Sequence, residues 1–383
     1  MASANANLHK AKGAKNDEFY TQLTDVAKEL MHYKAHFKDK IVLCNCDDPT
    51  WSAFWKYFHL NFAELGLKKL ISTHYDKTEP TYKMEYTGGD DNNIEVGVKT
   101  SLEGNGDFRN QECLDLLDES DIVVTNPPFS LFREYVAVLM EHEKKFLIIG
   151  NRNALTYKEI FPLIRNNELW LGNGFQNGNA YFNIPKNSDT SIYAKGVYDE
   201  ETGLVKFRNC VWFTNMDLAK RHEKIILWKN YTPEEFPKYD NYDAINVSKV
   251  SDIPCDYDGV MGVPITFLDK YNPDQFEIVA FRKGDDGKDL VFTREREREF
   301  NHTFVSLYDL DCRDDKKRRR QNQWEAYLRE NNNQTEIEPI DYFYPLHQSI
   351  AGVMNAAYET FVNGKNVYKR IVIRKKSCVR QKA

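Results

Sequence analysis

Short apolar runs and helical patterns alternate through the first half of the chain. The runs have the length of buried strands and lie at 41–44, 69–72, 121–124 and 146–149. Apolar residues between them recur at helical spacing, most clearly at 51–62 and 131–140. This alternation predicts an α/β fold with a Rossmann-like, mostly parallel, doubly wound sheet. Ligands of such sheets bind at the carboxyl ends of the strands.

The pattern changes after the central strands. A hairpin is expected between 82–86 and 94–99, turning at Gly88-Gly89. Apolar runs at 211–213 and 224–228 are interpreted as antiparallel strands that close the sheet. We place one domain at 1–230. A second, C-terminal region is expected at 231–383, with a charged insertion near 283–346 that lacks a clear apolar period.

The composition is that of a globular protein, with 41% hydrophobic and 29% charged residues. No apolar run approaches the roughly 20 residues that cross a bilayer, and residues 1–16 hold no apolar signal core. We therefore expect a cytoplasmic protein without membrane contact. The seven cysteines include no CxxC pair, which favours buried thiols and predicts no metal site.

The chain contains two basic segments although its formal net charge is −6. Net charge averages over the whole surface and does not reveal local basic patches. One is RDDKKRRR at 313–320, and the other is the tail at 365–382, with eight Lys or Arg and no acid. Local patches of this kind bind phosphates. The residues expected to contact DNA are Lys316, Lys317, Arg318, Arg319 and Arg320. A solvated surface is the alternative for this run.

Asn126, Pro127, Pro128 and Phe129 directly follow the apolar run at 121–124. An exocyclic amine of a base is a poor nucleophile because its lone pair is delocalised into the ring. Acceptors on both N–H groups, supplied by the Asn126 side chain and an adjacent backbone carbonyl, free that lone pair for in-line attack. The prolines hold the carbonyls in place, and Phe129 stacks on a flipped-out base. The segment predicts methyl transfer to a planar amine, with an ordinary Asn-Pro-Pro turn as the alternative.

The methyl donor for such chemistry is expected to be S-adenosylmethionine. The loop after the first strand offers Asn45, Asp47, Asp48 and Pro49 for the methionine moiety, although its aspartates can also cap a helix beginning near Thr50. Two further segments are candidates, each with a plain structural alternative. Asp107 suits the adenine amine and Phe108 the adenine ring, but Gly-Asn-Gly-Asp is also an ordinary turn. The segment NDEFYT at 16–21 either contacts the donor or forms the start of a helix.

Several segments together resemble the EcoRI-type adenine-specific DNA methyltransferase family, which is of the gamma amino-methyltransferase type. The matching segments are NDEFYT at 16–21, DPTWS at 48–52, NPPF at 126–129, YDNYDAINV at 239–247, YDGVMGVPITFL at 257–268 and NGKNVYKRIVIR at 363–374. The resemblance covers nearly the whole chain except about 283–346. The long C-terminal matches are more specific than NPPF, which other methyltransferases share.

This resemblance implies the fold of S-adenosylmethionine-dependent methyltransferases and transfer of a methyl group to adenine N6 in double-stranded DNA. We therefore expect 1–230 to be the catalytic domain, with an N-terminal donor-binding segment, and 231–383 to be a C-terminal target-recognition and DNA-binding region. It also implies that Phe19, Tyr20 and Thr21 pack near the donor. One departure is that NCDDP replaces the glycine-rich loop common among methyltransferases. The second strand also lacks the usual acid at its end, which leaves Asp76 as the candidate for that donor-binding position.

Other functions remain open at this point. NPPF-like peptides also accept RNA amines and protein glutamine amides, and a non-catalytic DNA-binding protein could retain the same fold. The basic segments favour nucleic acid, and an intact Asn126 favours an enzyme. A monomer is expected, with a cognate restriction endonuclease as a candidate partner. The sequence does not disclose the recognition sequence.

Overall fold

The computed structural model describes residues 20–76, 80–175, 178–184, 190–193, 196–239, 243–281, 329–330, 361–362, 365–367 and 370–376. The chain divides into two compact units, 1–222 and 223–383. This division lies near the predicted boundary at residue 230. The functions expected of the two parts remain predictions.

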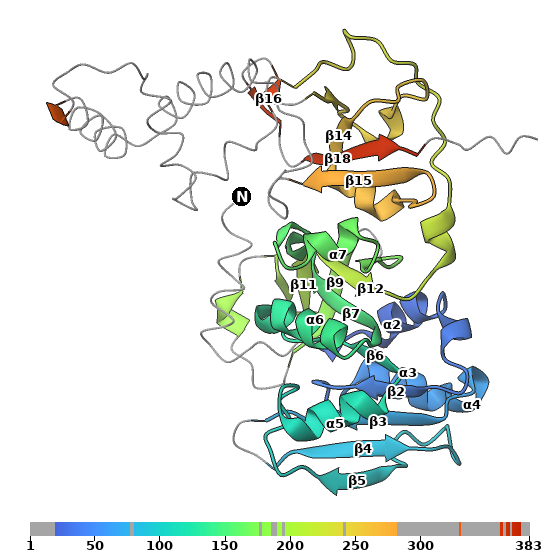
Figure 1. Ribbon diagram of the computed structural model, residues 1–383. Coiled ribbons are helices and arrows are strands. Elements are labelled where there is room, and N and C mark those ends of the chain that lie inside the picture. Colours follow the sequence, from blue (N-terminus) through green and yellow to red (C-terminus); the bar gives the residue numbers. More distant parts are fainter. Residues whose placement is uncertain are drawn as a thin grey trace, which may run out of the picture. The chain divides into compact units, whose positions relative to one another are not determined.

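Eight strands form the main sheet of the first unit, in the order β5-β4-β3-β2-β6-β7-β12-β8 (Figure 1). The four central strands, β3, β2, β6 and β7, are parallel. The outer pairings are all antiparallel, so the sheet is mixed around the expected parallel centre. The strands are β2 (Ile41–Cys44), β3 (Lys69–Thr73), β4 (Tyr82–Tyr86), β5 (Val98–Ser101), β6 (Ile122–Thr125), β7 (Lys145–Asn151), β8 (Trp170–Leu171) and β12 (Cys210–Thr214).

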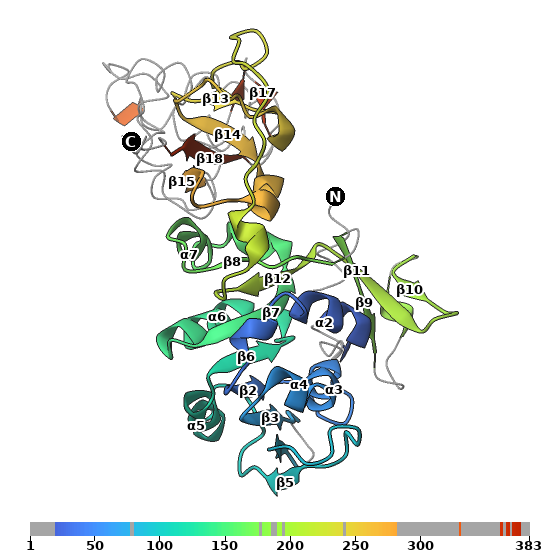
Figure 2. The same ribbon diagram turned by 90° about the vertical axis from the view of Figure 1, so that its right-hand side faces the viewer.

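Helices cover both faces of this sheet, as expected of a doubly wound fold. Figure 2 shows α5 and α6 on one side of the strands and α2, α3 and α4 on the other. The helices are α2 (Leu23–Leu30), α3 (Ala53–Leu60), α4 (Phe62–Leu65), α5 (Gln111–Glu119), α6 (Phe132–Glu141) and α7 (Phe161–Arg165). Short 3-10 turns are η1 (Lys34–His36), η2 (Phe129–Leu131), η3 (Arg152–Thr156), η5 (Thr190–Ile192) and η6 (Ala219–His222). The architecture is compatible with a methyltransferase fold.

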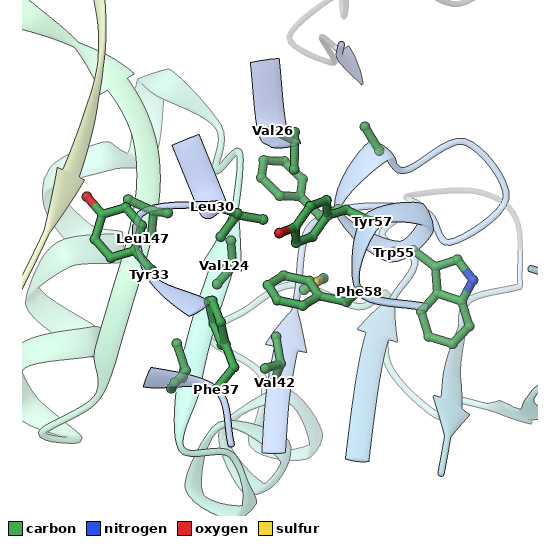
Figure 3. Close-up of a cluster of buried hydrophobic side chains, with 14 of the residues drawn as sticks. Val26, Leu30, Tyr33, Phe37, Val42, Trp55, Tyr57, Phe58, Val124 and Leu147 are labelled. Atoms are coloured by element: carbon green, nitrogen blue, oxygen red, sulfur yellow. The ribbon is translucent and has the colours of Figure 1, made fainter. Parts of the chain in front are cut away.

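The main hydrophobic core lies between the sheet and α2 and α3 (Figure 3). Side chains alternate along a strand, so Val42 and Cys44 of β2 face this core together with Val124 of β6. The fully buried Leu30 of α2 and Phe58 of α3 belong to the same core. Burying such side chains contributes roughly 1.5–3 kcal/mol each, which holds the strand ends in fixed positions.

The opposite face of the sheet is packed by α6. The Phe132 ring lies 4.9 Å from the ring of Phe213 in β12. Gly150 makes this approach possible, because a Cβ atom added there would lie 2.5 Å from the Phe132 ring and 2.9 Å from Phe213. Since α6 begins three residues after Phe129, this packing also fixes the segment between β6 and α6.

Two predicted strands differ in the structure. The hairpin is present, but its second strand is β5, so the connection is longer than a tight turn at Gly88-Gly89. The strand predicted at 224–228 is wrong: the described residues there have no regular structure. The Ile225 backbone instead pairs with the Gln275 side chain, at 2.8 Å for both hydrogen bonds. The second antiparallel pairing of β12 is made by β8.

A second, smaller sheet stands beside the main one and is called the small sheet below (Figure 2). Its order is β1-β9-β11-β10, and all its pairings are antiparallel. The strands are β1 (Tyr20–Thr21), β9 (Asn179–Asn183), β10 (Tyr198–Asp199) and β11 (Leu204–Arg208). Ala180 and Phe182 join the main hydrophobic core, so the small sheet is anchored to the rest of the first unit.

The second unit contains a four-stranded sheet in the order β13-β14-β18-β15 and a two-stranded hairpin, β16-β17. Tyr239 is buried in it, and its hydroxyl donates to Asn246 Oδ1 at 2.9 Å. Arg370 Nε donates to the same oxygen at 3.0 Å. The elements are β13 (Ile245–Asn246), η7 (Val250–Asp252), β14 (Met261–Pro264), η8 (Ile265–Lys270), β15 (Phe276–Phe281), β16 (Phe361–Val362), β17 (Lys365–Asn366) and β18 (Arg370–Lys375).

Candidate active site

Three predicted site segments follow adjacent parallel strands. Residues 45–49 follow β2, residues 74–76 follow β3, and residues 126–129 follow β6. Because β3, β2 and β6 are neighbours and run parallel, their carboxyl ends meet at one edge of the sheet. We call this the carboxyl edge. It brings the candidate base-binding and donor-binding segments together.

Asn45 is tied into the carboxyl edge by internal hydrogen bonds. Its backbone carbonyl accepts from the Thr125 hydroxyl of β6. Its side-chain oxygen accepts from the buried Tyr135 hydroxyl of α6. The next residue, Cys46, has a φ of 60°, a conformation that L residues rarely adopt. The chain thus turns sharply after β2, and Asn45 positions that turn against the strand that leads to Asn126.

Asp47 is a buried carboxyl at the carboxyl edge. Its Oδ2 accepts from the Ser52 hydroxyl at 2.8 Å, and its backbone N–H donates to Thr73 of β3 at 3.2 Å. The pKa of Asp47 is raised to about 8, chiefly by burial and less by the neighbouring Asp48, whereas the Ser52 hydrogen bond lowers it. A cation placed beside Asp47 would favour its ionised form.

Asp48 has a different set of partners. Its Oδ1 accepts from the Tyr82 hydroxyl at 2.8 Å and from the Thr50 backbone at 2.9 Å, while Oδ2 lies 3.7 Å from His74 Nε2. The alternative in which these aspartates cap the following helix is wrong. The cap of α3 is Ser52, whose hydroxyl accepts from the Trp55 N–H at 2.9 Å, because the turn at Cys46 delays the helix start.

The end of β3 holds polar atoms that the sequence analysis did not single out. Thr73 Oγ1 and His74 Nδ1 are buried and have no hydrogen-bond partner among the residues that the structure describes. Such groups are costly unless a ligand or water satisfies them. A Thr-His pair directly after a buried strand was the available signal. Asp76, the earlier candidate, is half-buried and donates its backbone N–H to Asn105 at 3.2 Å.

The loop that carries Asp107 and Phe108 is docked on the end of β3. Gly106 has a φ of +74°, and a Cβ atom there would lie 2.2 Å from the His74 carbonyl oxygen. Asp107 is held by Arg109, whose Nη2 donates to Oδ2 at 2.7 Å, and this guanidinium lowers the pKa of Asp107. Phe108 is buried with its ring 4.9 Å from that of Tyr135. Both predicted residues therefore directly follow the glycine that packs against the His74 backbone, although each already has a protein partner.

The segment from Asn126 to Phe129 joins the carboxyl edge to the small sheet. Asn126 and Phe129 are half-buried, and Pro127 is buried. The Phe129 ring meets the ring of Phe207 in β11 edge-on, with centroids 6.3 Å apart. Phe207 packs in the same way on Phe182 of β9, at 5.5 Å. The rings of Phe207 and Phe182 thus support Phe129 from one side.

The N-terminal candidate segment reaches the same place through the small sheet. Thr21 of β1 pairs with Phe182 of β9, and its buried Oγ1 has no hydrogen-bond partner among the described residues. Sequence spacing could not show this contact, because the two residues pair across more than half of the first unit. Of the other predicted site residues, Phe19 and the run Lys316 to Arg320 lie outside the described residues.

The described residues contain neither a cluster of metal ligands nor a membrane-spanning helix. No three His, Cys, Asp or Glu side chains gather there as a metal site would require. No helix in the same part of the chain is long and apolar enough to cross a membrane.

Known proteins resemble this chain along most of its length. The family model described as adenine-specific methyltransferase EcoRI matches residues 7–376. The type II methyltransferase M.EcoRI of Escherichia coli is 49% identical over 304 residues, which cover 75% of this chain and 93% of that protein. Type II methyltransferases of Mycoplasma genitalium (M.MgeORF184P) and Mycoplasma pneumoniae (M.MpnI) are 39% and 40% identical, each over 71% of this chain and covering 85% and 84% of their own lengths. No solved structure matches.

Proposed function

This chain belongs to the family of adenine-specific methyltransferase EcoRI, and from that premise we propose that it transfers a methyl group from S-adenosylmethionine to adenine N6 in duplex DNA. The relatives are named type II methyltransferases, which supports site-specific DNA over RNA or a protein glutamine as the substrate. The observation that carries the proposal is the position of Asn126 to Phe129 at the carboxyl edge. There the tetrapeptide lies beside the candidate donor loops and against the small sheet.

The target base is held by the tetrapeptide. Asn126 Oδ1 and the backbone carbonyl beside it accept the two N–H groups of N6, while the prolines keep those oxygens from rotating away. Phe129 offers a ring for stacking and is itself braced by Phe207 at 6.3 Å. This arrangement makes the amine pyramidal, so its lone pair points at the incoming carbon. Catalysis then depends on placement rather than on a shifted pKa at Asn126.

The carboxyl edge fits a nucleoside-type donor. Thr73 Oγ1 and His74 Nδ1 supply buried polar atoms suited to hydroxyl groups, and Gly106, just before Asp107 and Phe108, packs against the His74 backbone. Asp47 supplies a carboxyl whose ionised form a cation would stabilise. S-adenosylmethionine, when bound, supplies an electrophilic methyl group on a sulfonium. These residues would hold its ribose, adenine and charged parts.

Methyl transfer proceeds as a single displacement. N6 forms the new C–N bond as the C–S bond breaks, and that electron pair stays on sulfur, which becomes a neutral thioether. One proton leaves N6 for water. The protein's contribution is to exclude other orientations and to keep the amine in line with the methyl carbon.

The experiment supplies S-adenosylmethionine carrying a labelled methyl group, together with duplex DNA, RNA or a glutamine-containing protein. Label is expected in adenine N6 of unmodified duplex DNA only, and Asn126→Ala serves as the inactive control. Label in RNA or protein but not in DNA would overturn the proposal. Sequencing methylated bases in DNA from cells that express the protein would then give the recognition sequence. A cognate restriction endonuclease and a monomeric state remain predictions.

A further inference from the structure

The small sheet has two chemically different faces. Ala180 and Phe182 of β9 and Val205 of β11 are fully buried, and Phe207 continues this inner face toward Phe129. The residues between them point the other way, because side chains alternate along a strand. We call that side the outer face. Its members on the two central strands are Asn179, Tyr181, Asn183, Leu204, Lys206 and Arg208.

Cations and an aromatic ring stand together on the outer face. Lys206 is directly opposite Tyr181, and its Nζ lies 5.7 Å from the centre of that ring. Arg208 is exposed, and Tyr181 is 40% exposed, which is high for a tyrosine on a central strand. Strands β9 and β11 contain no acidic residue.

The charge of these two cations is not neutralised locally. Among the described residues, neither Lys206 nor Arg208 has a carboxylate partner within ion-pair distance. Arginines near the carboxyl edge differ in this respect, since Arg109 is bound to Asp107 at 2.7 Å. One acid does lie on the neighbouring edge strand, Asp199, but its carboxylate accepts the Glu201 and Thr202 backbone N–H groups of the turn. That turn is at the opposite end of β11 from Arg208.

We propose that the outer face of the small sheet contacts the sugar-phosphate backbone of the DNA strand that flanks the flipped adenine. This inference rests on the proposed function. Lys206 and Arg208, two residues apart on one strand and thus about 6.8 Å apart along it, contact neighbouring phosphates. Tyr181 packs on a sugar or an unstacked base, and the asparagines donate to phosphate oxygens.

The position of the face explains why it serves this purpose. Its reverse side braces Phe129 through Phe207, so a phosphate bound on the outer face is separated from the base site by a single layer of strands. A nucleotide leaving the duplex needs its flanking backbone fixed while the base enters the site. The same rigid sheet therefore holds the backbone on one side and the base-stacking residue on the other.

The test measures equilibrium binding of a fluorescent duplex of arbitrary sequence at several salt concentrations. Removing both charges with Lys206→Gln and Arg208→Gln should reduce the slope of log affinity against log salt by about 1–2, since each phosphate contact contributes about 0.9. Binding of S-adenosylhomocysteine should not change. The matched control is the pair Lys38→Gln and Lys68→Gln, two exposed lysines just before β2 and β3 at the opposite end of the strands. This control should keep the natural slope.

Several outcomes decide the matter. An unchanged slope in the Lys206 and Arg208 variant, or an equal decrease in the control, overturns the inference. If the double variant does not fold, Arg208→Lys and Tyr181→Ser replace it: the first should keep the slope, and the second should weaken binding about 5-fold or more. Failure of either expectation also overturns the inference. If the natural chain neither binds nor methylates duplex DNA, the proposed function fails instead.

Discussion

The carboxyl edge of the main sheet and the small sheet are built in opposite ways. At the carboxyl edge, the segments 45–49, 74–76 and 126–129 follow neighbouring strands, and polar contacts hold them, such as those of Asn45 with Thr125 and Tyr135. The small sheet joins β1 to three strands more than 150 residues further along the chain, since Thr21 pairs with Phe182. Its contact with the tetrapeptide is aromatic rather than polar, through Phe207 and Phe129.

This difference separates two tasks. In the proposed function, the carboxyl edge provides hydrogen-bonding atoms for the donor and the target amine, whereas the small sheet supports the Phe129 ring that is proposed to stack on the base. A change at the edge should therefore remove a chemical group. A change in the small sheet should leave every group present but misplace one of them. The predictions below test this separation in order of expected size.

The largest effect is expected for Asn126→Ala, which removes an acceptor for the target amine. The methylation rate should fall by about 10²- to 10³-fold, as for other preorganised polar groups. Affinity for S-adenosylhomocysteine, measured by calorimetry, should stay essentially unchanged because Asn126 is proposed to contact the base and not the donor. Asn126→Asp keeps an acceptor oxygen and should retain more activity than the alanine variant. A parallel loss of donor affinity and rate would assign Asn126 to the donor site and break the comparison.

A smaller effect is expected for Phe207→Leu in the small sheet. Leucine keeps most of the buried volume but removes the edge-on contact with Phe129 at 6.3 Å. Such aromatic pairs contribute about 0.5–1.5 kcal/mol beyond area burial, so the rate should fall by about 2- to 13-fold. In a double-mutant cycle with Phe129→Leu, the two rate effects should not be additive.

The matched control for Phe207 is Phe37→Leu. Phe37 makes an edge-on contact with Phe58 of α3 in the same unit, with ring centroids 5.1 Å apart. This variant should lower the melting temperature while keeping the rate per folded molecule. If Phe37→Leu and Phe207→Leu slow methylation equally, the small sheet has no special role in positioning Phe129.

The smallest effect concerns the polar side of the comparison and depends on pH. Burial raises the pKa of Asp47 from 3.8 to about 8. The folded state therefore holds this proton more tightly than the unfolded chain, and Asp47 lowers the free energy of unfolding progressively as pH rises from about 4 to 8. Asp47→Asn removes that loss. The difference in melting temperature between Asp47→Asn and the natural chain should therefore grow across this range. At pH 8 the variant should melt roughly 3–8 °C higher.

The control for Asp47 has the opposite sign. The hydrogen bond from His142 lowers the pKa of Asp118, so Asp118 stabilises the fold above its unfolded pKa of about 3.9 and loses this effect at lower pH. As pH rises, the melting temperature of Asp118→Asn should stay equal to or below that of the natural chain. An Asp47→Asn melting difference that does not change with pH would show that the carboxyl is not held protonated.

Much of the carboxyl edge could be predicted from the sequence. The apolar runs at 41–44, 69–72 and 121–124 are strands in the structure to within one residue, because a buried strand needs a continuous apolar segment. Their order was not predicted, and neither was the use of Ser52 rather than an aspartate as the cap of α3. That choice depends on the left-handed turn at Cys46, which no local pattern indicates.

The segment 224–228 shows the limit of local pattern. Its apolar residues suit a strand, yet Ile226 is 83% exposed, and the Ile225 backbone is paired by the Gln275 side chain. A strand requires a partner edge as well as an apolar sequence, and the partner is a tertiary property. The outer pairing of β12 is made by the two residues of β8 instead, which are too few to give a signal.

The sequence by itself determined the chemistry of the site. Asn126-Pro127-Pro128-Phe129 after a buried strand, together with the long matching segments, indicated methyl transfer to adenine, because hydrogen-bonding groups and strand ends are encoded locally. Only the tertiary structure decided what holds that chemistry in place. Pairing of Thr21 with Phe182 and packing of Phe207 on Phe129 depend on burial of apolar faces contributed by distant segments. Hydrophobic burial is non-directional, so the pattern shows that these faces will be buried but not against which partner.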